Sequence, residues 1–310
     1  MTSTLRRLPF LALLASATLL AACGGSASST ASSGGGGGGS LQVVAAENFW
    51  GSLATQLAGS KAHVTSLITS PTTDPHDYEP TPADGRAIAS AKLVIVNGIG
   101  YDAWADKLLA ANPVDGRVVL KVGDVVGIAP GGNPHRWYSP SNVQQVIDQI
   151  VADYKRLDPG DAAYFDAQKQ KLETQGLKQY LGLIAAIKAK YAGTPVGASE
   201  SIFAPLAADL GLKLITPAAY LKAVSEGSDP TAADTATTHR QITSKQIKLW
   251  VFNSQNAIPD VKRLNEQAKA NNVPVATVTE TLTPAGASFE QWQVRELTEL
   301  KSALREGTGR

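Results

Sequence analysis

Short apolar runs that alternate with helical stretches constrain the fold of this chain more than any other sequence feature. Runs rich in Val, Ile and Leu lie at 41–46, 63–68, 92–97 and 117–126. The segments between the first three runs, and after the third, have the apolar spacing of helices, at 48–60, 81–91 and 101–111. Continuous apolar strands separated by helices are typical of a parallel sheet that is covered on both faces. The first part of the chain is therefore predicted to be an α/β lobe.

The same alternation returns after residue 193. Predicted strands lie at 195–198, 212–215, 249–253 and 274–278, and predicted helices at 202–210, 231–246, 258–270 and 288–306. The stretch between the two alternating parts, residues 140–192, is predicted to be helical, with one helix to residue 157 and another over 159–192. A helix of roughly 30 residues would be ~45 Å long, more than one small domain needs. We therefore predict an N-terminal lobe (41–158), a linking helix (159–192) and a C-terminal lobe (193–310).

The amino terminus has the layout of an export signal. Arg6 and Arg7 precede an apolar run, 8–22, that is too short for a comfortable transmembrane helix. The run ends Leu-Ala-Ala-Cys-Gly, which resembles a bacterial lipobox, in which the cysteine is lipidated and becomes the first residue of the mature chain. This predicts a signal peptide over 1–22 and a lipid anchor on Cys23. The alternative is a plain signal peptide followed by a stray cysteine.

Residues 24–40 are almost all Gly, Ser, Ala and Thr. Such a segment cannot bury enough apolar surface to fold, so 23–40 is predicted to be a lipidated cysteine followed by a flexible tether. A chain of this length and composition spans about 20–25 Å on average. The predicted location is the outer face of the bacterial cytoplasmic membrane.

Composition excludes several classes of function. The 310 residues contain 28 Lys and Arg against 27 Asp and Glu, so no electrostatic attraction to nucleic acid is expected. Cys23 is the only cysteine of the sequence, which excludes internal disulfides and thiolate metal sites. A metal site would have to use imidazole and carboxylate groups.

Two loops place a histidine directly after a proline, at Asp74-Pro75-His76 and Asn133-Pro134-His135. Proline fixes φ and removes a backbone donor, so each loop is expected to hold its imidazole stiffly. One loop histidine is more often solvated than bound to metal, but two such loops among four histidines favour a site. His76 and His135 follow strands of the first lobe, and Glu200 and Glu280 follow strands of the second. Since open α/β sheets bind ligands beyond the carboxyl ends of their strands, the four would converge if the lobes face each other.

Five motifs together resemble one family. They are DPHDYEPTPAD (74–84), NPHRWYSP (133–140), SESIFAPLAADLGL (199–212), SEGSDPTAAD (225–234) and TVTETLTP (277–284). Over about residues 41–307 the sequence resembles the cluster A-I metal-binding lipoproteins of ABC transporters, which carry zinc or manganese. The resemblance implies two α/β lobes joined by one long helix, with the metal held in the cleft between them. It also implies four metal ligands: His76, His135, Glu200 and Glu280.

The sequence departs from the family pattern in four places. Tyr138-Ser139 stands where Leu-Asp is usual, which leaves the surroundings of the second histidine open. Glu200 replaces the His of many zinc-binding members, and Glu280 stands where Asp is usual. The long His- and Asp-rich loop of several zinc members is missing.

The remaining candidates have ordinary interpretations. His63 lies within a predicted strand and His239 in a polar helix, so both are expected to be structural or solvated. Gly98-Ile99-Gly100 lacks the third glycine of a dinucleotide turn and is rejected as one. No role is assigned to Asp77, Glu79 or Asp84, although such carboxylates can accept a hydrogen bond from a ligand histidine.

These observations predict a binding protein and not an enzyme. The expected partners are a divalent metal ion (Zn²⁺ or Mn²⁺), a membrane permease and the membrane itself, with the protein acting as a monomer. Two carboxylates suit Mn²⁺, whereas the general affinity order favours Zn²⁺. Since imidazolium cannot coordinate, binding is expected to weaken below a pH of about 6.5.

Two other functions would fit part of the sequence. An exported metallohydrolase with two histidines and one carboxylate would keep a position open for water, but a fourth protein carboxylate is available here and the sequence has no HExxH pair. In a lipoprotein adhesin or scaffold, the metal would only staple the lobes together.

Overall fold

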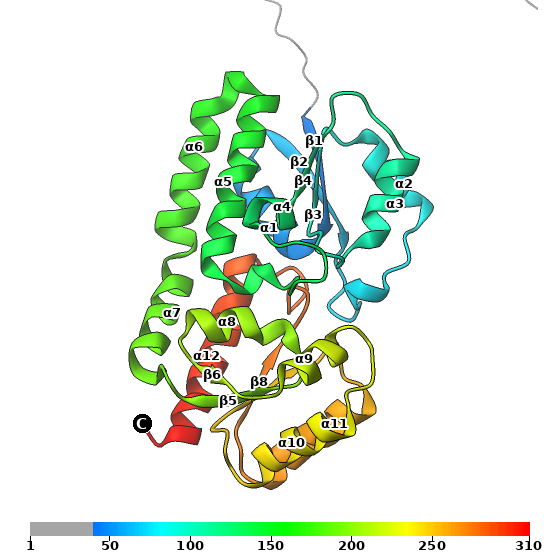
Figure 1. The fold of residues 1–310 in the computed structure, drawn as a ribbon. Helices are drawn as coiled ribbons and strands as arrows, with labels where there is room; N and C mark the ends of the chain where they lie inside the picture. Colours follow the sequence, from blue (N-terminus) through cyan, green and yellow to red (C-terminus); the bar gives the residue numbers. More distant parts are fainter. Residues whose placement is uncertain (1–39) are drawn as a thin grey trace, which may run out of the picture. The chain divides into compact units, whose positions relative to one another are not determined.

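A computed structural model describes residues 40–310, except for the side chain of Asp77. The predicted signal peptide, the tether up to residue 39 and Cys23 lie outside the described residues. Within 40–310 the chain forms two parallel sheets, each flanked by helices, so the predicted α/β fold class is confirmed. We call the elements around the first sheet lobe one and those around the second sheet lobe two (Figure 1).

The two sheets have the same strand order. The first has the order β2-β1-β3-β4 and the second β6-β5-β7-β8, all parallel. The strands of the first are β1 (Leu41–Glu47), β2 (Ala62–Ile68), β3 (Leu93–Val96) and β4 (Val118–Lys121). The strands of the second are β5 (Pro195–Ala198), β6 (Lys213–Leu214), β7 (Trp250–Asn253) and β8 (Val275–Val278). The first strand of each lobe lies inside its sheet. The second strand pairs on one side of it, and the third and fourth strands follow on the other side. This creates a switch point between β1 and β3 and another between β5 and β7, where ligands bind in open α/β sheets.

Helices cover both faces of each sheet. Those of lobe one are α1 (Asn48–Ala58), α2 (Pro82–Ser90), α3 (Ala103–Ala111), α4 (Val122–Val126) and α5 (Pro140–Leu157). Those of lobe two are α8 (Ala204–Asp209), α9 (Ala218–Ser225), α10 (Ala232–Thr243), α11 (Pro259–Ala270) and α12 (Phe289–Thr308). Trp50, Trp137, Trp250 and Trp292 are all fully buried and belong to one hydrophobic core that extends through both lobes. A smaller core lies under α2 and α3.

A helical rod lies between the two sheets in the sequence and runs along one side of both lobes (Figure 1). It consists of α6 (Ala162–Lys171), a π-helical turn (Leu172–Gly176) and α7 (Lys178–Tyr191). The predicted single helix over 159–192 is therefore interrupted. Over Leu172–Gly176 the backbone hydrogen bonds span five residues in place of the four of an α-helix. The lobe boundaries at 158 and 192 remain a prediction.

One further prediction about local structure was wrong, and one helix was missed. The predicted strand over 117–126 ends at Lys121, and its second half forms α4. Gly123 packs so closely on Ile99 that an added Cβ would lie 2.7 Å from that side chain, and Gly127 ends the helix at φ 69°. Helix α9 was not predicted, although its buried Tyr220, Leu221 and Val224 have helical spacing.

Candidate metal centre

His135 is positioned by an asparagine of its own loop. Oδ1 of Asn133 lies 2.9 Å from Nδ1 of His135, and the Asn133 amide donates to the carbonyl of Ser201 at 2.7 Å. Since a carbonyl oxygen only accepts, Nδ1 must carry the ring proton. The lone pair therefore lies on Nε2, which makes no hydrogen bond to any described residue. A ring N–H held by a neighbouring oxygen, with the other nitrogen available, is the usual arrangement of a metal-binding histidine.

His76 sits in a short 3₁₀ turn (Pro75–Asp77) after β2. Oδ1 of Asp74 accepts a hydrogen bond from the His76 backbone N–H at 2.9 Å, which caps the turn. The imidazole packs edge-on against the ring of Tyr101, with centroids 4.5 Å apart, and its centroid is 6.0 Å from that of His135. The two Pro-His loops therefore lie side by side.

Glu200 and Glu280 are both fully buried and share one donor. Nδ2 of Asn253, at the end of β7, donates to Oε1 of Glu200 at 2.6 Å and to Oε1 of Glu280 at 2.8 Å. The hydroxyl of Tyr101 reaches across from lobe one and donates to Oε2 of Glu280 at 2.9 Å. Oε2 of Glu200 is buried without a hydrogen bond to the rest of residues 40–310. A buried carboxylate oxygen without a donor is costly, and a cation would relieve that cost.

His76, His135 and Glu280 form a compact donor group. One ligand atom of each lies within 4.8 Å of the others, and Nε2 of His135 is 3.5 Å from Oε2 of Glu280. Donor atoms that share a zinc ion at bond lengths of about 2.0–2.2 Å lie roughly 3.3–3.6 Å apart in tetrahedral geometry. Glu200 lies beside this group and is joined to it through Asn253. The donors come from both lobes and fit a divalent metal ion.

Burial sets the protonation of these groups. It raises the pKa of Glu200 to about 8, with a further increase from the neighbouring Glu280. It raises the pKa of Glu280 to about 7, although His76 and Tyr101 counteract part of the effect. It lowers the pKa of His135 to about 4, against the pull of the nearby carboxylates. His135 is therefore neutral near pH 7, while Glu200 is mostly protonated and Glu280 is protonated in part, and a metal ion would displace these protons.

This distribution bears on one expectation. Loss of metal binding below a pH of about 6.5 was predicted from histidine protonation. Burial lowers the pKa of His135 to about 4, so this imidazole stays neutral at pH 6.5, whereas Glu200 and Glu280 take up protons at higher pH. The pH dependence of metal binding stays a prediction.

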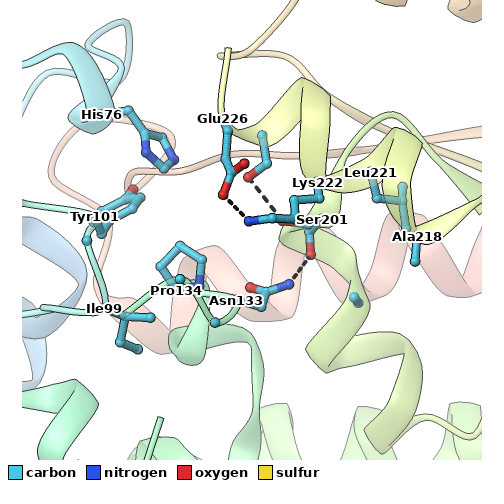
Figure 2. Close-up of a pocket in the computed structure, with 15 residues that line it drawn as sticks. His76, Ile99, Tyr101, Asn133, Pro134, Ser201, Ala218, Leu221, Lys222 and Glu226 are labelled. Atoms are coloured by element: carbon cyan, nitrogen blue, oxygen red, sulfur yellow. Dashed lines mark hydrogen bonds and ion pairs between the residues drawn. The ribbon is translucent and has the colours of Figure 1, made fainter. Parts of the chain in front are cut away.

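A cavity of about 380 Å³ opens next to the donor group between the lobes. Figure 2 shows His76 and Tyr101 on the lobe-one side, and Ser201 and the Lys222–Glu226 ion pair on the lobe-two side. Gly100 and Ile99 line the cavity as well, and Ile99 has a φ of 62°. The Gly98-Ile99-Gly100 turn thus places the Tyr101 hydroxyl against Glu280.

Several residues around the donors were missed by sequence reasoning. Tyr101, Asn133 and Asn253 each bond directly to a predicted ligand. Asn253 ends a predicted strand at the same edge as Glu200 and Glu280, so its position was a usable signal. His63 and His239 are exposed, as expected, and Nε2 of His239 pairs with Gln267 at 2.6 Å. Asp84 caps α2 together with Thr81 and accepts from Tyr78 at 2.9 Å.

Comparison with known proteins decides the family. The model of the family described as zinc-uptake complex component A, periplasmic, matches residues 43–303. The chain belongs to this family. The predicted family resemblance is thereby confirmed, and the periplasmic zinc-uptake component family is one of metal-binding transport proteins.

Curated relatives of this zinc-uptake component family match at modest identity. The manganese-binding lipoprotein MntA of Halalkalibacterium halodurans is 28% identical over 46% of this chain and 48% of its own length. The iron-binding protein YfeA of Yersinia pestis is 33% identical over 56% of this chain and 57% of its own length. The manganese ABC transporter substrate-binding lipoprotein PsaA of Streptococcus pneumoniae is 25% identical over 84% of this chain and 88% of its own length. The chain thus spans about half the length of MntA and YfeA.

Solved structures show the same fold. The Mn-bound periplasmic metal binding protein from Candidatus Liberibacter asiaticus superposes with a TM-score of 0.70 at 22% identity, over 84% of this chain and 98% of that one. The protein FpvC of P. aeruginosa, in complex with Ni²⁺, gives a TM-score of 0.69 at 21% identity, over 86% and 97%. At these identities the likeness establishes the fold of the family in this chain.

Proposed function

We propose that this protein is the extracytoplasmic binding component of an ABC transporter for a divalent transition metal. It captures Zn²⁺ or Mn²⁺ between its lobes and delivers the ion to a membrane permease. Membership of the zinc-uptake component family supports this proposal. The names of MntA and PsaA, which refer to manganese, agree with it.

One observation carries the proposal. His76 and His135 of lobe one lie with Glu280 of lobe two in a single donor group, and Glu200 adjoins them. A site built from two lobes is exposed whenever the lobes separate, so an ion can be bound and then released to another protein. We propose these four residues as the ligands, and 41–158, 159–192 and 193–310 as the two lobes with their linking helix.

The site has the donors of a carrier and not those of a hydrolase. A catalytic zinc ion usually has three protein ligands and keeps one position for water. Here Glu200 supplies a fourth buried donor with one oxygen that makes no hydrogen bond within residues 40–310. We therefore propose that the protein performs no catalysis.

The donor set accommodates both proposed cargoes. Two imidazoles and two carboxylates make a harder site than one with three histidines, and hard oxygen ligands suit Mn²⁺. The general affinity order places Zn²⁺ above Mn²⁺ at nearly any site with nitrogen and oxygen donors. We propose that Zn²⁺ binds more tightly and that Mn²⁺ binds with micromolar or better affinity. Glu200→His should then weaken Mn²⁺ binding more than Zn²⁺ binding, because it exchanges an anion for a neutral imidazole.

We also propose that Cys23 anchors a monomeric protein to the outer face of the cytoplasmic membrane. The lipobox-like sequence supports this, and relatives such as MntA are named as lipoproteins. In residues 40–310 we find no helix with both the length and the apolar character needed to cross a bilayer.

Metal uptake by the native host tests the proposal. Deletion of the gene should reduce accumulation of radioactive Zn²⁺ or Mn²⁺ from metal-poor medium, and the wild-type gene should restore it. A gene carrying both His76→Ala and His135→Ala should not restore it, although the variant protein is made. Unchanged uptake of both metals in the deletion strain would remove the transport role.

A further inference from the structure

Tyr138 connects the lobes directly behind the donor group. It is fully buried, and its hydroxyl donates to Oε2 of Glu296 at 2.6 Å and lies 3.0 Å from the carbonyl of Thr279. Its ring packs edge-on against Trp292, with centroids 5.7 Å apart. Glu296 and Trp292 belong to α12 of lobe two, whereas Tyr138 ends the turn that begins at His135 in lobe one.

Glu296 gathers hydrogen bonds from this region. Its Oε1 accepts from the backbone N–H and the hydroxyl of Thr279, both at 3.0 Å, and from Nε1 of Trp292 at 2.8 Å. With the bond from Tyr138, both carboxyl oxygens have a partner, and all four residues are buried. Such a buried network allows little displacement of any of its members.

Both ends of the network adjoin predicted ligands. The Tyr138 backbone N–H donates to the His135 carbonyl at 3.2 Å, and Thr279 is the residue directly before Glu280. The network thus joins the backbone that carries His135 to the backbone that carries Glu280. His135 adjoins one end of this connection and Glu280 the other, and their donor atoms, Nε2 and Oε2, lie 3.5 Å apart.

Packing alone is a poor explanation for these residues. Burying Glu296 costs free energy, and replacing a buried polar cluster with apolar side chains of similar volume is often neutral or stabilising. A leucine in place of Tyr138 would fill apolar space without bonding to a carboxyl. The Tyr138 hydroxyl adds a directional contact between lobes, and such contacts fix geometry more than they add stability.

We propose that Tyr138 is a positioning residue of the metal centre. Through Glu296 and Thr279 it sets the separation of His135 and Glu280 before any metal arrives. The expected effect of Tyr138 on metal affinity rests on the proposed function. The expected effect on the separation of the lobes concerns the metal-free protein alone.

A matched pair of substitutions tests this role. Tyr138→Phe removes only the hydroxyl that reaches lobe two. Tyr154→Phe makes the same change at a fully buried tyrosine whose hydroxyl donates to the carbonyl of Ala54 at 2.9 Å, inside lobe one. We expect Tyr138→Phe to weaken Zn²⁺ binding about tenfold, and Tyr154→Phe to leave it within twofold of wild type. Both variants should lose some thermal stability.

The separation of the lobes provides a readout that does not depend on metal. Spin labels on Ala89→Cys in α2 and Ala270→Cys in α11, both exposed positions, report this distance in the full chain with Cys23→Ser. Pulsed electron resonance of the metal-free protein should give a broader distance distribution for Tyr138→Phe than for wild type or Tyr154→Phe. Saturating Zn²⁺ should narrow it again.

Variants of Glu296 separate hydrogen bonding from volume. Glutamine is close to glutamate in size and, unlike leucine, keeps a hydrogen-bond acceptor at this position. Glu296→Gln keeps an oxygen for Thr279 and Trp292 and should bind Zn²⁺ within threefold of wild type. Glu296→Leu keeps the volume but accepts no hydrogen bond, and it should weaken binding at least as much as Tyr138→Phe.

The outcomes distinguish this inference from the proposed function. If wild type binds Zn²⁺ but Tyr138→Phe matches it in both affinity and distance distribution, the positioning role is overturned. The same holds if Tyr154→Phe loses as much affinity as Tyr138→Phe, because the effect is then a general loss of stability. If wild type binds no metal, the proposed function fails, and the distance distributions still decide whether Tyr138 fixes the lobes.

Discussion

Nε2 of His135 lies 3.5 Å from Oε2 of Glu280, although the two residues belong to different lobes. Asn133 directs the proton of His135 to its other nitrogen, and Tyr101 and Asn253 fix the Glu280 carboxyl. The lone pairs of both residues therefore occupy one small buried volume. A divalent cation placed there could bind both donor atoms at once.

Removing a predicted histidine ligand should weaken metal binding selectively. We expect His135→Ala to weaken Zn²⁺ binding at least tenfold, which corresponds to about 1.4 kcal/mol, and His76→Ala to do the same. His239→Ala is the control, because His239 is exposed on α10 and pairs with Gln267. Isothermal titration of metal-free protein measures all three. Equal affinities for His135→Ala and His239→Ala would remove His135 from the site.

Asn253 should matter for both stability and affinity. Asn253→Ala removes the donor that Glu200 and Glu280 share, and an unsatisfied buried acceptor costs about 1–3 kcal/mol. We expect a lower midpoint of thermal unfolding in the metal-free protein and weaker Zn²⁺ binding. Asn271→Ala removes an amide that donates to the Gln267 carbonyl near the end of α11 and not to a proposed ligand, and serves as the control. A variant with unchanged melting and unchanged affinity would contradict the bridging role.

The stability of the metal-free protein should fall as pH rises from 5 to 8. The pKa values of Glu200, Glu280 and Glu296 are raised to about 8, 7 and 8 by burial, from an ordinary value of 4.5. The folded state thus binds more protons than the unfolded state in this range. The contribution of these groups is complete below pH 4.5 and is lost as pH rises through 7 to 8.

Metal should reverse this trend. At pH 7 Zn²⁺ must displace protons from the two predicted carboxylate ligands, so its affinity should increase up to about pH 8. Calorimetric melts at several pH values, with and without Zn²⁺, measure both effects. Titrations in buffers with different ionisation enthalpies give the number of protons released. Zn²⁺ affinity that is constant between pH 6 and 8 would argue against Glu200 and Glu280 as ligands.

Cys23 is predicted to be the membrane anchor. Cys23→Ser should release the protein into the medium or leave it unprocessed, because one or more acyl chains would no longer be attached. Fractionation of cells that express each form measures the distribution. A Cys23→Ser protein that loses its signal peptide yet stays fully in the membrane fraction must be anchored elsewhere.

Most of the fold could be predicted because its signals are local. The apolar run at Leu93–Val96 is buried on both faces, and the helix over Pro140–Leu157 begins with a proline in its first turn. The segment after Lys121 shows where local sequence patterns fail, since an apolar run there forms a short helix. Gly123 packs against Ile99 of a distant loop, and Gly127 ends the helix with a positive φ. The π-turn at Leu172–Gly176 was not predicted either, because only the presence of Gly176 hints at it.

The sequence predicted those residues of the candidate site that come after the ends of predicted strands. His76, Glu200 and Glu280 follow strands that the sequence indicated, so each lies at the carboxyl edge of its own sheet. Only the packing of the two lobes against each other brings His76 to the glutamates. The partners Tyr101 and Asn133 could not be predicted, because their roles depend on which atoms face each other after the lobes pack. The same applies to Tyr138, whose departure from the usual motif is visible in the sequence, while its partner Glu296 is known only from the structure.

The central claim is that one divalent metal ion is held between the lobes by histidine and glutamate. The metal content of the protein measures this directly. Metal-free protein is incubated with excess Zn²⁺ or Mn²⁺ and separated from unbound ions on a desalting column. Its metal is then counted by elemental mass spectrometry. Wild type should retain one ion per chain, whereas the His76→Ala, His135→Ala double variant should retain none. Wild type without bound metal, or a double variant that retains as much metal as wild type, would contradict the account.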